Sequence, residues 1–89
     1  MSLTTHASIR AQQRGIPPLV LDWLETYGDE SFDHHGAVIL HFSKRSVRRL
    51  ERAVGRQPVC KLKEYLRCYA VLSDGHVVTV GKRFKHIKA

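Results

Sequence analysis

The chain has side chains that can move protons, and others that can stabilise a charged phosphate, on or beside its expected sheet. RNA can be cleaved without a metal if an acid or base moves the 2′-hydroxyl proton and cations stabilise the phosphorane. Histidine, tyrosine, lysine and arginine together supply both functions. On or beside the expected sheet the chain has His41, Arg67, Tyr69, Lys82, Arg83 and His86. This set permits metal-free RNA cleavage, although any small basic domain offers similar groups.

Metal and cofactor chemistry has no comparable support in the sequence. No cysteine or carboxylate stands at ligand spacing from the six histidines, and the adjacent His34 and His35 would point to opposite sides of a strand. The sequence has no P-loop, no GxGxxG and no GxSxG turn. Cys60 and Cys68 do not form a CxxC pair and are expected to stay reduced. We therefore expect neither a metal nor a cofactor.

The clearest charge pattern lies in a predicted helix over residues 44–54, which Ser43 would cap and Gly55 would end. Apolar residues form one stripe of this helix. The opposite face carries four arginines at i, i+3, i+4 and i+7: Arg45, Arg48, Arg49 and Arg52. Like charges at these spacings repel each other, and a phosphate backbone would relieve the repulsion and release counterions. The alternative is an ordinary solvated face.

The net charge of +7 is unevenly distributed along the chain. Residues 1–43 carry a net charge of −3, and residues 44–89 carry +10. This asymmetry favours one side that faces a polyanion and a separate acidic side. The alternative is that the charge only keeps a small protein soluble.

Two further regions supply candidate contacts to nucleic acid. Arg10 and Arg14 stand at i,i+4 on a predicted helix, where they repel unless an anion or carboxylate lies between them. Pairing with acidic residues of the first half is an equally good interpretation. The C-terminal sequence KRFKHIK adds Lys82 and Lys85.

Residues 66–84 predict a β-hairpin around Asp74-Gly75, because an Asp-Gly pair between apolar, β-rich runs favours a two-residue turn with positive φ. Such a turn would pair Tyr69 with Val80. One face would then hold Tyr69, Val71, Val78 and Val80, and the other Cys68, Ala70, Leu72, Val77, Thr79, Gly81 and Arg83. The sequence leaves open which face meets the helices, since a one-residue slip exchanges the two.

The other elements follow from hydrophobic periodicity and turn residues. Helices are predicted over about residues 5–14 and, with a clean amphipathic stripe, over 16–27. Residues 28–33 predict an acidic loop or a short edge strand, residues 37–42 a buried strand, and residues 56–64 a polar connector. The order α-α-β-β-α-β-β predicts an α+β fold with two N-terminal helices and one further helix packed on a four-stranded antiparallel sheet.

The chain of 89 residues, 43% of them apolar, fits a single domain over residues 1–89. No apolar run approaches the roughly 18 residues that span a bilayer, and the N-terminus lacks the apolar core of a signal peptide. We therefore expect a cytoplasmic protein without a membrane partner.

Both ends of the sequence resemble a family of small bacterial domains of unknown function. The first motif is HxxxRxxxRGIP, from His6 to Pro17, and the second is YAVLSDGHVVTVGKR, from Tyr69 to Arg83. That family is related to RelE/ParE-type toxins, which implies helices over a curved antiparallel sheet. RelE-like ribonucleases work inside the ribosome with Arg, Lys and Tyr on the sheet, whereas ParE-like relatives attack a different target. The helix at 44–54 departs from compact RelE proteins, so the resemblance implies roles for Tyr69 and Arg83 alone.

Two functions from different classes follow. The first is a RelE-like small basic protein that contacts RNA or the ribosome as a toxin-type endonuclease, with an antitoxin as a further candidate partner. Tyr69 or His41 would then move protons, Arg83 would steady the phosphate, and the helix arginines would hold the backbone. The second is a non-catalytic module that binds RNA, DNA or an acidic protein. A blander alternative is an oligomeric scaffold that uses Trp23 or an exposed strand edge.

Overall fold

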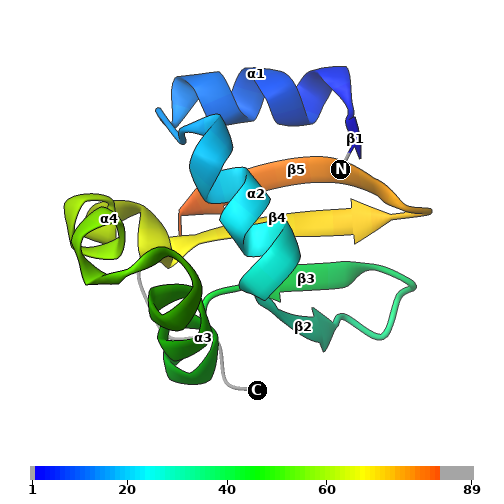
Figure 1. The fold of residues 1–89 in the computed structure, drawn as a ribbon. Helices are drawn as coiled ribbons and strands as arrows, with labels where there is room; N and C mark the ends of the chain where they lie inside the picture. Colours follow the sequence, from blue (N-terminus) through cyan, green and yellow to red (C-terminus); the bar gives the residue numbers. More distant parts are fainter. Residues whose placement is uncertain (1, 83–89) are drawn as a thin grey trace.

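The computed structural model describes residues 2–82, in which helices pack on one sheet (Figure 1). The expected α+β fold and the order of its two helices, two strands, helix and two strands are confirmed. Short elements that the sequence did not predict are added to this order. The elements are β1 (Ser2–Leu3), α1 (Thr5–Gln13), α2 (Pro18–Tyr27), β2 (Asp29–Phe32), β3 (Val38–His41), α3 (Lys44–Val54), α4 (Arg56–Lys61), the 3₁₀ helix η1 (Lys63–Arg67), β4 (Cys68–Ser73) and β5 (His76–Lys82).

The sheet has the strand order β1-β5-β4-β3-β2. Strands β2 to β5 form the expected four-stranded antiparallel sheet, and the two-residue β1 adds a short parallel pairing with β5. Residues 28–33 had two interpretations, and most of them form the edge strand β2. Gly28 precedes β2, at the end of α2. A side chain is not tolerated at this position, because a Cβ would lie 2.4 Å from the carbonyl oxygen of Leu24.

The turn between β4 and β5 has the expected two residues, Asp74 and Gly75, with φ of 52° and 79°. Positive φ at both central residues is the geometry that an Asp-Gly pair favours, because it matches the twist of the flanking strands. A β-bulge beside Val71 and Leu72 then shifts the register, so Tyr69 pairs with Gly81 and not with Val80. The predicted pairing was therefore wrong by one residue beyond the bulge.

The bulge also corrects the expected faces of the hairpin. Leu40, Ala70 and Val80 are paired across three strands and are at most 5% exposed, so they form the face that meets the helices. Neighbours along each strand point to the opposite face. Val80 therefore shares a face with Ala70, whereas Thr79 and Gly81 share the face of Tyr69.

Helices α1 and α2 lie on the same side of the sheet, α1 beside β5 and α2 across β3 and β4 (Figure 1). Thr4 caps α1 by accepting a hydrogen bond from the backbone N–H of Ala7. Among the described residues, no helix is both long and apolar enough to span a membrane. The buried core joins the helices to the sheet and comprises Ala7, Ala11, Ile16, Val20, Leu21, Trp23, Leu24, Leu40, Phe42, Leu50, Val59, Cys68, Ala70, Val77 and Val80.

The helix α4 replaces part of the polar connector that residues 56–64 predicted. Gly55 ends α3 and, with φ of 92°, turns the chain directly into α4. Pro58 is tolerated because it stands in the first turn, where a backbone N–H has no intrahelical partner. Val59, only 5% exposed, anchors the short helix to the core. Helices α3 and α4 lie together at the end of the sheet opposite the β2–β3 and β4–β5 turns (Figure 1).

Candidate nucleic-acid interface

Local hydrogen bonds fix the start of α3 and thereby the direction of its side chains. Ser43 and Ser46 form a reciprocal cap, in which each backbone N–H donates to the other residue's hydroxyl at 2.7 and 3.1 Å. Ser46 and Leu50 are fully buried beneath the helix. Because these residues face the core, the four predicted arginines face solvent, and all four are exposed.

Arg45 differs from the other three arginines because it forms an ion pair. Its Nη2 lies 2.8 Å from Oδ1 of Asp29, on the edge strand β2. Ser43 donates its hydroxyl to the same carboxylate. These two contacts hold the pKa of Asp29 below its usual value, the Ser43 hydrogen bond contributing most. Arg45 thus links α3 to β2 and is less available to a ligand.

Arg48, Arg49 and Arg52 form no ion pair with any carboxylate in the described part of the chain. They stand three and four residues apart on one helix, where like charges destabilise by about 0.2–0.5 kcal/mol per pair. An anion bound between them would offset this repulsion by its attraction to each arginine. These three arginines are therefore the strongest candidates for phosphate contacts among the predicted residues.

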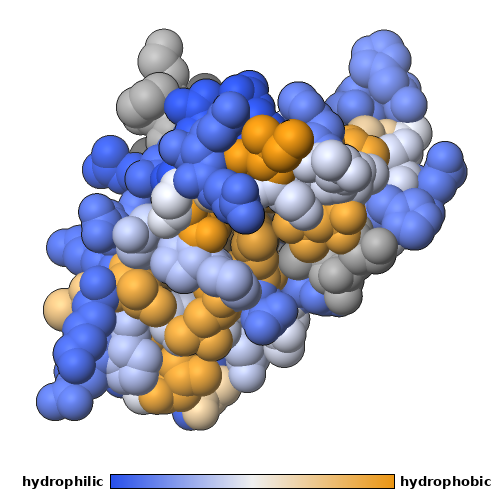
Figure 2. All heavy atoms as spheres, turned by 90° about the horizontal axis from the view of Figure 1, so that it is seen from above, coloured by the Kyte–Doolittle hydropathy of each residue, from blue (hydrophilic) through white to orange (hydrophobic). Residues whose placement is uncertain are grey.

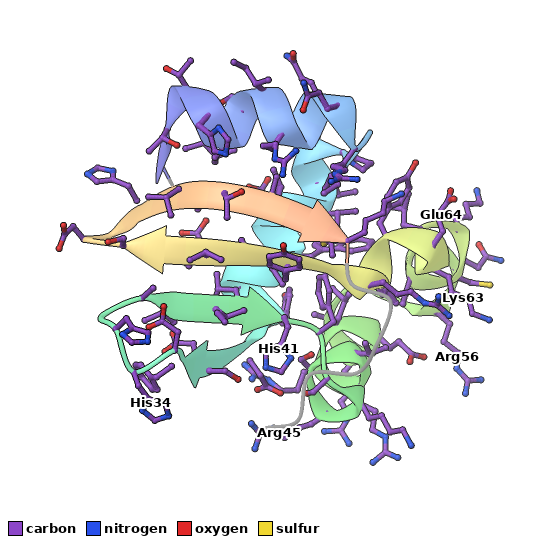
Figure 3. All side chains as sticks on the ribbon, turned by 180° about the vertical axis from the view of Figure 1, so that it is seen from behind. His34, His41, Arg45, Arg56, Lys63 and Glu64 are labelled. Atoms are coloured by element: carbon purple, nitrogen blue, oxygen red, sulfur yellow. The ribbon has the colours of Figure 1, made fainter. Side chains whose placement is uncertain are left out.

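The charged region extends past α3 into elements where the sequence predicted no site. Residues 44–67 contain nine Lys or Arg and two Glu, a net charge of +7 that equals the net charge of the chain. All nine cations are exposed and lie on α3, α4 and η1, and the labelled Arg45, Arg56 and Lys63 show this end of the molecule in Figure 3. We define them as the basic surface: Lys44, Arg45, Arg48, Arg49, Arg52, Arg56, Lys61, Lys63 and Arg67. The sequence signal for this extension was the positive charge of residues 56–67. It was missed because a polar connector would carry the same charges.

Two open pockets lie within the basic surface. One, of about 390 Å³, is lined by Arg48, Glu51, Arg52 and Arg56. The other, of about 510 Å³, is lined by Cys60, Lys61, Lys63, Glu64 and Arg67. In each pocket three cations surround a single glutamate, so both favour an anionic ligand.

Two of the other predicted cations, Arg10 and Arg14, lie away from this surface. Arg10 is on α1 and Arg14 directly follows it, beside β5, whereas α3 lies near the opposite edge of the sheet (Figure 1). Neither forms an ion pair with a described carboxylate, so the alternative of internal pairing finds no partner within residues 2–82. Lys82 places its Nζ 5.2 Å from the centre of the Tyr65 ring, a cation–π contact. Lys85 and Arg83 lie outside the described residues.

The candidate catalytic residues His41 and Tyr69 are paired across β3 and β4. They lie on the sheet face away from α1 and α2, which no described helix covers (Figure 3). His41 is 1% exposed, and its Nε2 lies 3.0 Å from the Ser31 hydroxyl. The Tyr69 ring lies on Gly81, where a Cβ would stand 2.9 Å from the phenolic oxygen. His41 and Tyr69 are therefore cross-strand neighbours, but the arginines lie on α3 and α4 and not on the sheet face.

Metal ligands and thiols give no second site. In residues 2–82 no three His, Cys, Asp or Glu side chains are grouped as metal ligands. His34 and His35 are in the turn between β2 and β3, where Asp33 accepts from the backbone N–H groups of His35 and Ala37. Cys60 is exposed and Cys68 is buried, and no disulfide joins them.

The surface elsewhere is mixed in character. Figure 2, which looks down on α1, shows apolar side chains that reach the surface among hydrophilic ones. The large apolar residues that are most exposed are Ile9, Leu19 and Phe32. Comparisons with protein-family models, with curated proteins and with solved structures gave no match.

Proposed function

We propose that this protein binds nucleic acid, with RNA as the expected class, through the basic surface of α3, α4 and η1. The observation that supports this most is the position of the charge. One short stretch holds the whole net charge of +7, at one end of the molecule, on exposed side chains. Seven of its nine cations form no ion pair with a described carboxylate.

Arginine is the residue type best suited to this role. Its planar guanidinium donates two parallel hydrogen bonds to phosphate oxygens and stacks on bases. Six of the nine cations are arginines, and three of them, Arg48, Arg49 and Arg52, share one face of a helix that is capped and anchored in the core. Several guanidinium groups on one helix face fit a regularly spaced polyanion better than they fit an isolated acidic side chain.

Direct binding tests the proposal with a matched pair of variants. Arg49→Gln removes an exposed arginine of α3, and Arg14→Gln removes an exposed arginine directly after α1, so only the first change touches the basic surface. The affinity for a labelled single-stranded RNA should fall about threefold for Arg49→Gln, the size of one exposed charge contact. Arg14→Gln should bind as the unmodified chain does. Equal losses in the two variants would contradict a localised interface.

A second candidate function, cleavage of the bound RNA, is favoured by the juxtaposition of His41 and Tyr69. In this proposal Tyr69 moves the proton, with His41 beside it, and Arg83 steadies the phosphate. The expected outcome is that induced expression arrests growth and that the Tyr69→Phe, Arg83→Ala double variant loses both arrest and cleavage. Full arrest and full RNA cleavage by the double variant would dismiss these roles and leave a non-catalytic binding module.

The same proposal carries the expected biological setting. A RelE-like domain of this kind would act in the bacterial cytoplasm on RNA or on the ribosome, with an antitoxin as a candidate protein partner. The support for this setting is the resemblance of both ends of the sequence to RelE-related domains, together with the α+β fold.

A further inference from the structure

The corner between α3 and α4 forms a small pocket with an unusual set of charges. Gly55 turns the chain so that Arg56, the first residue of α4, comes back toward the last turns of α3. The resulting pocket of about 390 Å³ is lined by Arg48, Glu51, Arg52 and Arg56. Arg48 and Arg52 stand one helical turn apart on its α3 side.

The ion pair within this pocket leaves most of its positive charge unused. Nε of Arg56 lies 3.5 Å from Oε2 of Glu51, so the contact occupies one edge of one guanidinium. Arg48 and Arg52 have no carboxylate partner among residues 2–82. Three guanidinium groups and one carboxylate give the pocket a net charge of +2, and the arginines repel each other until an anion is bound.

We propose that this pocket binds a terminal phosphate, the phosphomonoester at the end of a nucleic-acid strand. A phosphomonoester carries a charge of about −1.5 to −2 at neutral pH and exposes three free oxygens. A backbone diester has one charge and two free oxygens, and it is equally well placed anywhere on the basic surface. The pocket offers three guanidinium groups, two from α3 and one from α4. It therefore suits the phosphomonoester, which has a third free oxygen and a second charge, better than the diester. This inference rests on the proposed function and specifies which part of the strand the protein recognises.

The test compares matched strands on the full chain. Fluorescence anisotropy is measured with a single-stranded RNA of about ten nucleotides, labelled internally, that carries a 5′-hydroxyl, a 5′-phosphate or a 3′-phosphate. The variants are Arg52→Gln, which removes a pocket arginine, and Arg49→Gln, which removes an arginine of the same helix outside the pocket. Both side chains are exposed, and thermal unfolding confirms that each variant folds.

One of the two phosphorylated strands should bind about three- to tenfold more tightly than the hydroxyl strand, the size expected of one or two exposed charge contacts. Arg52→Gln should abolish this preference. Arg49→Gln should weaken all three strands alike and keep it. Inorganic phosphate should displace the phosphorylated strand only at concentrations far above those of the strand itself.

Other results would overturn the inference in distinguishable ways. Equal affinities for all three strands would reject the terminal-phosphate site and leave the proposed nucleic-acid function intact. If Arg49→Gln also lost the preference for the phosphorylated strand, that preference would come from the total charge of the protein and not from the pocket. Displacement by inorganic phosphate at strand concentrations would assign the pocket to a free phosphate compound. Absence of binding to any strand at low salt would reject both proposals.

Discussion

At the scale of single residues, Asp29 shows how one carboxylate links two elements. It receives the Ser43 hydroxyl and the Arg45 guanidinium, and its side chain is 16% exposed. The sequence placed Asp29 in an acidic segment and Arg45 in an arginine face, but they are sixteen residues apart in the chain. The charge pattern of the sequence identifies the acidic and basic residues. Only the fold determines which carboxylate pairs with which arginine.

This contact predicts a pH-dependent contribution to stability. The pKa of Asp29 is lower in the folded chain than in the unfolded one, so the folded state binds fewer protons there. The stabilisation is complete above the unfolded pKa of about 4 and is lost as pH falls through the lower, folded pKa. Asp29→Asn should therefore cost about 1 kcal/mol at pH 7 and nothing once Asp29 is protonated.

Urea unfolding of both chains across the acid range measures this difference. Asp22→Asn is the control, because Asp22 is exposed on α2 and has no described hydrogen bond or ion pair. A difference between Asp29→Asn and the unmodified chain that stays constant down to the lowest pH would show that the loss is not electrostatic.

At the scale of elements, the β4–β5 hairpin shows both the success and the limit of sequence reasoning. Asp74-Gly75 predicted the turn correctly, because few residue types adopt positive φ at two successive positions. The bulge beside Val71 and Leu72 carries no comparable signature, since any residue can occupy it. It moves Tyr69 from Val80 onto Gly81 and exchanges the faces of β5. A local turn rule cannot detect a register change that the packing of the whole sheet decides.

The observed register predicts an energetic coupling between Tyr69 and Gly81. A methyl group at position 81 would lie about 3 Å from the Tyr69 ring, so Gly81→Ala should destabilise the chain by about 1 kcal/mol. With Tyr69→Ala already present, the same change should be neutral or stabilising, because alanine loses less backbone entropy than glycine in a strand. Thermal or urea unfolding of the four chains gives the interaction energy. Additive effects would contradict the contact between the ring and the glycine.

The helices repeat this contrast. The pattern of α3 is correct at both ends, since Ser43 and Gly55 are strong boundary residues. Helix α4 was missed because a polar six-residue segment with an internal proline resembles a loop. It forms because Val59 reaches the core and Pro58 falls in the first turn, both of which depend on where α3 ends. The missed helix also hid the pocket at its junction with α3.

At the scale of the whole molecule, charge and fold divide the protein into two ends. The turns β2–β3 and β4–β5 lie at one end, and the basic surface lies at the other (Figures 1 and 3). Residues outside 44–67 sum to zero net charge, so the excess positive charge of the chain equals that of α3, α4 and η1. Such a field attracts a polyanion to one end of the molecule. The sequence predicted the asymmetry, but its extension across α4 and η1 required the structure.

The salt dependence of RNA binding is the most direct measurement of this charge-driven association. A plot of log K against log salt concentration, from about 50 to 200 mM, should have a slope between about −2 and −5 for single-stranded RNA, equivalent to three to seven phosphate contacts. Arg49→Gln should reduce the magnitude of the slope by about 0.7, and Arg14→Gln should leave it unchanged. A slope near zero, or the same slope in all three chains, would contradict nucleic-acid binding through the basic surface.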